Sequence, residues 1–214
     1  MQKLMCICTL ALCLLTAGAA FSADADTVYS QAVVDYNIGK YDAALKALRP
    51  LAEAGHAKAQ ILLGRCYENG LGVPQNGETA VFWFRKAAEQ RDAMGELLMG
   101  YSCQVGFGVP QDTAQALVWF RKAADQGLAE AQYRLGVLYN DGTGVKQNQD
   151  EAAQWFLKAA EQGNPYAQRY MGAYYEKGIG NLEANAQLAE EWYAKAAAQG
   201  IDRTGNVFIT PRGE

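Results

Sequence analysis

The chain has 214 residues, of which 50% are hydrophobic and 20% are charged, and its formal net charge at pH 7 is −4. A charge this small and mixed gives no electrostatic footprint for nucleic acid or for an anionic lipid surface. The hydrophobic fraction suits an ordered protein and excludes a chain that is disordered throughout.

Residues 1–22 have the layout of a secretory signal peptide. One early positive charge, Lys3, precedes an apolar run that starts at Leu4, and small residues close the segment. Ala20 and Ser22 suit the −3 and −1 sites of signal peptidase, so cleavage is predicted after Ser22. The apolar run is shorter than the ~20 residues that a membrane-spanning helix needs. We therefore expect a periplasmic or secreted mature chain without stable membrane insertion.

Residues 23–54 are predicted to form a short pair of helices. The turn between them is Asn37-Ile38-Gly39-Lys40, in which glycine permits the left-handed backbone that a tight connection needs. Ala47 occupies a position that is tryptophan in each of the four segments that follow.

One pattern then occurs four times, and its most distinctive residue is a tryptophan. These tryptophans are spaced by 36, 36 and 37 residues: Trp83, Trp119, Trp155 and Trp192. A fixed period in this range is the signature of a solenoid built from stacked repeats. The four repeats are 55–90, 91–126, 127–162 and 163–199.

Each repeat predicts two helices joined by a loop with paired glycines. The first helix carries a glycine in its interior: Gly64, Gly100, Gly136 and Gly172. A glycine inside a helix costs about 1 kcal/mol relative to alanine, so its recurrence indicates the close approach of a neighbouring helix. In the second helix apolar residues step by three and four, which is a helical stripe. We expect the tryptophans of this stripe to be the main aromatic residues of the core.

The residue that follows each of the last three repeats is a glycine, which suits the position after a helix: Gly127, Gly163 and Gly200. Arg91 stands there after the first repeat, so this junction is expected to be less favourable. Residues 200–214 lose the pattern and are interpreted as an irregular tail or a short cap over the last repeat.

Two cysteines, Cys66 and Cys103, lie beyond the predicted cleavage site. Export into an oxidising compartment would make a disulfide between them chemically available. Each also lies on a predicted helix, where a small buried thiol is ordinary. Both alternatives, a Cys66–Cys103 bridge and two separately buried thiols, stay open.

The string A-x-x-x-L-G-x-x-Y-x-x-G-x-G-V, followed by A-x-x-W-F-x-K-A-A-x-Q-G, resembles the Sel-one-like repeat (SLR), a relative of the tetratricopeptide repeat (TPR). The resemblance covers 55–199, and the lead-in ALKALRPLAEAG, 44–55, is similar to segments that often precede such arrays. It implies an all-α fold, a right-handed α/α superhelical solenoid of antiparallel helix pairs, with 23–54 as a TPR-like helical pair. It also implies a role as an adaptor in assembling complexes, including those of the cell envelope.

The chain offers few residues for catalysis. His56 is the only histidine, and neither a C-x-x-C nor an H-E-x-x-H motif occurs. The S-x-x-K and K-T-G signatures of penicillin-recognising enzymes are also missing. We therefore expect no catalytic residue, metal site or cofactor, and we interpret the chain as a non-enzymatic protein–protein interaction scaffold of the bacterial cell envelope. The alternative is the weak β-lactamase-like or cell-wall hydrolase activity described for cysteine-rich SLR proteins.

In TPR-like arrays the inner wall is built from residues of the first helices. Counted from the helical glycine, the positions six before, three before and one after are expected to point there. These positions change from repeat to repeat and include tyrosine and arginine, which are enriched in binding hot spots. The predicted groove, for an extended peptide or a partner helix, consists of Arg65, Leu97, Tyr101, Tyr133, Val137, Tyr166 and Arg169. The alternative is that they are ordinary exposed or helix-packing residues.

Overall fold

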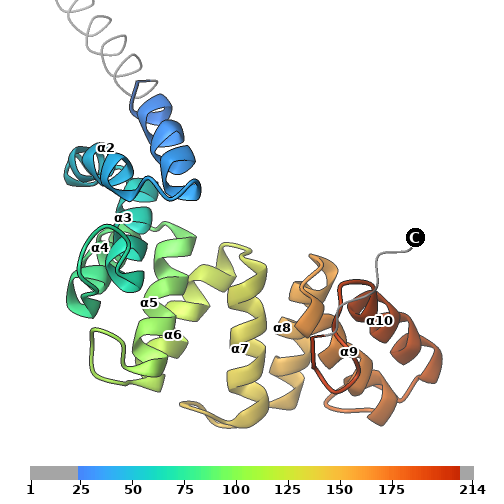
Figure 1. Ribbon diagram of the computed structural model, residues 1–214. Coiled ribbons are helices and arrows are strands. Elements are labelled where there is room, and N and C mark those ends of the chain that lie inside the picture. Colours follow the sequence, from blue (N-terminus) through green and yellow to red (C-terminus); the bar gives the residue numbers. More distant parts are fainter. Residues whose placement is uncertain (1–23, 208–214) are drawn as a thin grey trace, which may run out of the picture. The chain divides into compact units, whose positions relative to one another are not determined.

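The computed structural model describes residues 24–207, so the predicted signal peptide and residues 208–214 lie outside the described part. This part is helical apart from loops and one isolated antiparallel bridge, Ile201–Val207 (Figure 1). Residues 24–37 form a helix that precedes α2. The helices that follow are α2 (Tyr41–Glu53), α3 (Ala57–Asn69), α4 (Gly77–Glu89), α5 (Ala93–Val105), α6 (Thr113–Asp125), α7 (Ala129–Asp141), α8 (Gln149–Glu161), α9 (Pro165–Lys177) and α10 (Ala186–Ala198).

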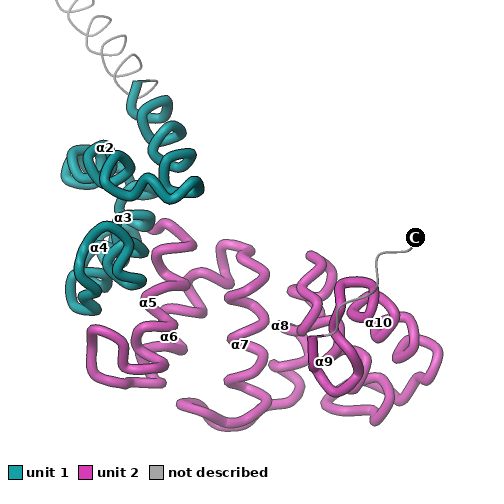
Figure 2. The backbone as a smooth tube through the Cα atoms, in the orientation of Figure 1, with its two compact units in different colours: residues 1–90 teal, residues 91–214 magenta. Residues whose placement is uncertain are grey.

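The chain divides into two compact units between Gln90 and Arg91 (Figure 2). In the described part, unit 1 holds the helix 24–37 and α2–α4, and unit 2 holds α5–α10. Inside unit 2, α5 packs on α6, α7 on α8 and α9 on α10, and α6 and α8 also contact the helices that follow them. Within each unit, successive helices therefore form a stack of antiparallel pairs, and the predicted all-α solenoid class is confirmed.

The helical glycines are explained by aromatic rings of the second helices. A Cβ atom built on Gly136 would lie 2.6 Å from Cδ1 of Phe156, and the same close approach recurs in every repeat. The rings involved are Phe84, Phe120, Phe156 and Tyr193. The close approach predicted from the recurring glycine is confirmed, because only a missing side chain makes room for these rings.

The expectation that the tryptophans are the main aromatic residues of the core was wrong for three of the four; Trp155, 6% exposed, is buried in the core. The three phenylalanines are fully buried and Tyr193 is 7% exposed, whereas Trp83, Trp119 and Trp192 are only half-buried. Adjacent residues of a helix point about 100° apart. The ring that faces the first helix is therefore the residue after the tryptophan, and in three of the four repeats the tryptophan lies at the edge of the core.

Side-chain caps begin almost every helix of the repeats. The second helices start after Asn76, Asp112, Asn148 and Asn185, whose side chains accept hydrogen bonds from backbone amides of the first turn. His56 caps α3 through Nδ1, which accepts a hydrogen bond from the Ala59 amide at 3.1 Å. Its Nε2 lies 3.2 Å from Oδ1 of Asp26.

The turn between repeats requires a left-handed residue. Gly55, Gly127, Gly163 and Gly200 occupy it with φ between 83° and 94°. Arg91 takes the same position with φ 63°, the only non-glycine residue with positive φ among residues 24–207. An L-residue in this conformation costs roughly 1–2 kcal/mol. The arginine at this position therefore strains the backbone, and it lies at the boundary between the two units.

A buried glutamine ties the repeats to one another. Gln132 donates to the carbonyl of Ala124 in the preceding repeat and accepts from Gln162 at 2.7 Å. Gln60 and Gln168 make the corresponding pairs of bonds. The second repeat has Glu96 instead, which accepts from Gln126 at 2.7 Å but as a carboxylate has no hydrogen to donate.

The start of the C-terminal segment is ordered against α9 and α10. Ile201 is buried, and the carboxylate of Asp202 accepts hydrogen bonds from the backbone amides of Thr204 and Asn206. The guanidinium of Arg203 pairs with Glu190 and lies over the ring of Tyr193, 4.7 Å from its centroid. Residues 201–207 therefore cover the side of the last repeat.

Candidate protein-interaction surface

The residues predicted to line the groove of unit 2 lie on three first helices, α5, α7 and α9. Tyr101, Tyr133, Val137 and Arg169 are half-buried, and Tyr166 is 37% exposed. Leu97 differs, because only 4% of it is exposed. Tyr133 and Arg169 hold the same repeat position, and their longer side chains reach beyond the helix contact that hides a leucine.

Arg65 belongs to α3 of unit 1, where it is half-buried. It therefore does not belong to the surface of unit 2. The partly exposed groove residues that share unit 2 are Tyr101, Tyr133, Val137, Tyr166 and Arg169.

A hydrogen-bonded network joins the three helices at one side of this surface. The carboxylate of Glu130 accepts from the Tyr101 hydroxyl at 2.6 Å, from Nε of Arg134 at 2.8 Å and from the Asn164 amide at 3.0 Å. Nε of Arg134 also lies 2.9 Å from the Tyr101 oxygen. Burial and the bond to Glu130 raise the pKa of the Tyr101 hydroxyl, which keeps it a neutral donor at neutral pH. The network fixes the side chains around it.

Aromatic rings continue from this network. Tyr133 and Tyr166 stack with centroids 5.8 Å apart, and Tyr133 lies 6.1 Å from Tyr170. Tyr170 stacks on the buried ring of Phe156 at 4.3 Å. Burial raises the pKa of the Tyr133 hydroxyl as well. These rings are held by the core on one side and are partly open on the other.

Two arginines flank the rings. The guanidinium of Arg134 lies 5.2 Å from the centroid of Tyr133 and 4.9 Å from that of Tyr101. The guanidinium of Arg169 lies 4.2 Å from the centroid of Tyr170. We call the set the tyrosine–arginine surface; it consists of Tyr101, Tyr133, Arg134, Tyr166, Arg169 and Tyr170.

Sequence reasoning missed Arg134, Tyr170 and Asn164. It placed Glu130 on the inner wall, six residues before Gly136, but did not predict its hydrogen-bonded network. Glu130 and Arg134 are an i, i+4 ion pair, which was a readable signal. The sequence carries no such signal for Tyr170, because its position in the surface follows from stacking on Phe156 of the second helix.

The C-terminal segment reaches one end of this surface. A Cβ atom built on Gly205 would lie 3.3 Å from Nε of Arg169. Arg169 is therefore in contact with the turn 201–207 on one side and with Tyr170 on the other.

Cys66 and Cys103 are both buried. Cys66 belongs to the core of unit 1, and burial raises the pKa of its thiol to about 11. Cys103 belongs to unit 2, so the structure does not place the two thiols relative to each other. Both alternatives, a Cys66–Cys103 bridge and two separately buried thiols, stay predictions.

Within residues 24–207, no three histidine, cysteine, aspartate or glutamate side chains converge as a metal site requires. In the same residues no helix combines the length and the apolar character needed to cross a bilayer.

The Sel1 repeat model matches residues 57–92, 93–128, 129–164 and 165–201. The chain belongs to the Sel1 repeat family. Each Sel1 repeat begins two residues later than the sequence pattern placed it, at the first residue of α3, α5, α7 and α9. Sel1 repeats are stacked helical repeats, a class whose common role is to bind other proteins.

Solved structures of other Sel1 repeat proteins are similar to this one. An Escherichia coli protein, c5321, described as a protective antigen of uropathogenic strains with an SLR fold, is 46% identical with a TM-score of 0.71. The match covers 73% of this chain but only 33% of that protein. A Sel1 repeat protein from Oxalobacter formigenes is 34% identical with a TM-score of 0.74, over 80% of this chain and 70% of its own. A comparison with curated proteins gives no match.

Proposed function

We propose that this Sel1 repeat protein is a non-enzymatic scaffold of the bacterial cell envelope that holds a protein partner on its tyrosine–arginine surface. The observation that carries the proposal is the continuity of this surface. Tyrosines and arginines of α5, α7 and α9 contact one another from Tyr101 to Arg169, and Glu130 fixes one side through three hydrogen bonds. Rigid aromatic and arginine side chains give a partner large contact area at little cost in side-chain entropy.

The partner that suits this surface best is an extended peptide or one face of a helix. The rings run along successive first helices, so they offer contacts in a row rather than in one enclosed pocket. Arg134 is neutralised by Glu130, whereas Arg169 has a neutral ring and a backbone turn as neighbours. A carboxylate of the partner would therefore be placed best beside Arg169.

The proposed place of action, the periplasm or the outside of the cell, rests on the leader-like residues 1–22. It is supported by the similarity to c5321, which is described as a protective antigen. Fractionation of cells that express the full chain, with N-terminal sequencing of the product, tests it. The expected product begins after Ser22.

The binding proposal is tested by crosslinking in cells, capture of the protein from the envelope fraction and identification of partners by mass spectrometry. A captured partner is then titrated against purified variants. Tyr133→Ala with Tyr166→Ala should weaken binding at least tenfold, since hot-spot truncations cost about 2 kcal/mol or more.

Tyr139→Ala is the matched control, because Tyr139 lies on the same helix as Tyr133 but contacts Arg121 of α6. Circular dichroism must show that all variants fold. Full affinity of the folded double variant would exclude the tyrosine–arginine surface. Hydrolysis of nitrocefin by the purified protein would instead support the β-lactamase-like alternative; we expect none.

A further inference from the structure

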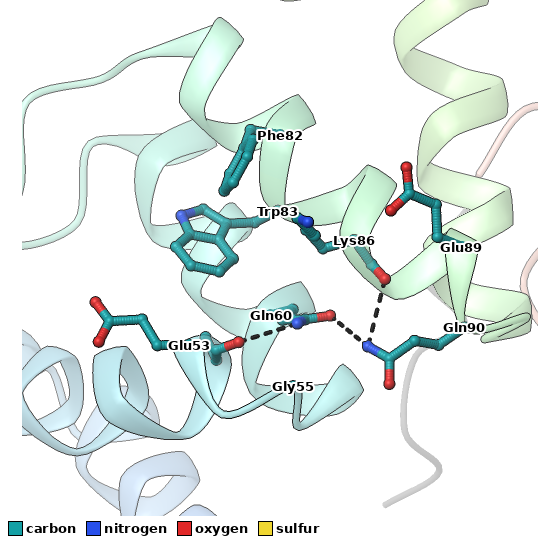
Figure 3. A pocket seen from close by; sticks show the side chains of 9 residues that line it. Glu53, Gly55, Gln60, Phe82, Trp83, Lys86, Glu89 and Gln90 are labelled. Atoms are coloured by element: carbon teal, nitrogen blue, oxygen red, sulfur yellow. Dashed lines mark hydrogen bonds between the residues drawn. The ribbon is translucent and has the colours of Figure 1, made fainter.

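Unit 1 contains an open cleft of about 500 Å³ on a different set of helices from the tyrosine–arginine surface. Its walls come from the end of α2, the first turn of α3 and one face of α4 (Figure 3). The side chains that matter most are Glu53, Gln60, Phe82, Trp83, Lys86 and Glu89. The volume lies within the roughly 300–1,000 Å³ of typical ligand sites.

The floor of the cleft is fixed before any ligand arrives. Gln60 is buried, donates to the carbonyl of Ala52 at 3.0 Å and accepts from the amide of Gln90 at 2.8 Å (Figure 3). These bonds hold both the nitrogen and the oxygen of its amide, so the recognition groups that we consider are the aromatic rings and the charged side chains.

The other repeats indicate what binds to the face of this tryptophan. In each of them, the lysine three residues after the tryptophan places Nζ over the indole. The distances from Nζ to the ring centroid are 4.1 Å for Lys122 on Trp119, 4.0 Å for Lys158 on Trp155 and 3.9 Å for Lys195 on Trp192. The indole at this repeat position is thus a built site for an ammonium group.

The first repeat leaves this site open. Lys86, the equivalent lysine, lies over Phe82, with Nζ 5.7 Å from the ring centroid. No lysine lies over Trp83 in the part of the chain that the structure describes. Phe82 is 51% exposed and packs edge-on against Trp83, while the equivalent residues in later repeats offer no ring: Val118, Gln154 and Glu191.

The charge around the cleft favours a cation. Glu53 and Glu89 contribute two carboxylates to its wall against the single ammonium of Lys86. In Figure 3 Glu53 lies below the indole of Trp83, and Glu89 lies beyond Lys86 with its carboxylate directed away from the indole. An ammonium group on this ring would lie in a cleft whose wall carries more carboxylates than ammonium groups, and the same arrangement disfavours an anionic ligand.

We propose that the unit 1 cleft binds the side chain of a lysine presented by a protein partner, with its ammonium group over Trp83. The lysine takes the position that the chain's own lysines hold in the other three repeats. Its methylene stem lies against Phe82, and Glu53 and Glu89 balance its charge. This site is separate from the tyrosine–arginine surface and does not depend on it.

The test uses the isotope-labelled protein and follows the indole N–H signals of its tryptophans by NMR, with the Trp83 signal assigned from Trp83→Phe. The probe is Nα-acetyl-lysine methylamide, and its norleucine analogue is the control ligand. The lysine probe should shift the Trp83 signal saturably at millimolar concentration and leave the signals of Trp119, Trp155 and Trp192 in place. The norleucine analogue should shift none of them.

Variants with opposite expected effects separate recognition from loss of fold. Lys86→Met should tighten binding of the lysine probe severalfold, because it removes the competing ammonium group. Glu53→Gln with Glu89→Gln should weaken binding severalfold. Lys158→Met and Glu161→Gln, the equivalent changes in the third repeat, should leave the Trp83 titration unchanged. Equal binding of norleucine, weaker binding by Lys86→Met, or shifts at all four tryptophans would each overturn the proposal.

Discussion

Neighbouring aromatic residues of the second helix have different structural roles. Phe120 is fully buried, and Gly100 leaves room for its ring, whose Cδ1 and Cε1 atoms would each lie 2.5 Å from a Cβ built on that glycine. Trp119 is half-buried at the edge of the core, with Lys122 over its ring. The two positions cannot be ranked from composition, because both are large, aromatic and part of the same helical stripe.

We expect Phe120→Ala to lower the free energy of unfolding by about 3–5 kcal/mol, as the loss of a fully buried ring does. Trp119→Ala should cost only about 1–3 kcal/mol, since part of the indole is already in contact with water. Urea unfolding of the two variants measures the difference. A larger loss for Trp119→Ala would contradict the assignment of the core to the phenylalanine.

Arg91 is the second residue whose replacement is informative. It holds a left-handed φ of 63° at a position that is glycine at the other repeat ends. Arg91→Gly removes strain of roughly 1–2 kcal/mol but adds freedom to the unfolded chain, so a net gain of about 0.5–1 kcal/mol is expected. Arg91→Ala is the control: it removes the same side chain and keeps the strain. Equal stability of the two variants in thermal unfolding would show that the backbone conformation is not the cause.

At the scale of elements, much of the fold follows from local sequence. The recurring helical glycine predicts a close helix contact, and the structure supplies the ring that makes it. Sequence could not reveal which aromatic residue provides that ring, or that His56 caps α3, because both depend on the direction of a side chain in space. For the candidate surface, repeat position identified Tyr101, Tyr133 and Tyr166. It did not distinguish buried Leu97 from them, because that difference depends on the length of the side chain.

Glu96 holds the position at which the other repeats have the buried glutamine that links successive helix pairs. This difference affects how the stability of the protein depends on pH. Glu96 is 3% exposed, and burial raises the pKa of its carboxyl, opposed by the hydrogen bond from Gln126 and by Lys122 and Arg91. A carboxyl whose pKa is higher in the folded state binds more protons there than in the unfolded state. Its ionisation therefore lowers stability as pH rises from the unfolded pKa through the folded pKa.

Glu96→Gln should accordingly stabilise the protein by about 1 kcal/mol at pH 7, since a neutral amide avoids the buried charge and can donate a hydrogen bond. The gain should shrink below pH 4, where the wild-type carboxyl is protonated in both states. Melting temperatures of the two proteins between about pH 3 and about pH 8 test this. Glu89→Gln, at an exposed position, is the control. A gain that does not change with pH would show that the charge of Glu96 is not responsible.

At the scale of the whole molecule, stability in a repeat array is the sum of repeat and interface contributions, so separate parts can open separately. Unit 1 contains one Sel1 repeat and the preceding helices, in which Ala47 replaces the tryptophan, whereas unit 2 contains three Sel1 repeats. We expect unit 1 to open at a lower free energy than unit 2.

Within residues 24–207 each unit carries one buried cysteine, Cys66 in unit 1 and Cys103 in unit 2, so in a chain that lacks residues 1–22 the two thiols report on opening separately. The reduced protein should react slowly with a thiol reagent without denaturant, since the thiol of Cys66 is buried and its pKa is about 11. In moderate urea Cys66 should be labelled before Cys103, as measured with the Cys66→Ala and Cys103→Ala variants. Denaturing the chain that lacks residues 1–22 without prior reduction also tests the alternative of a bridge, because a Cys66–Cys103 disulfide would leave that chain no reactive thiol. Equal labelling rates at every urea concentration would mean that the two units unfold as one, and that the boundary at Arg91 does not divide the stability of the array.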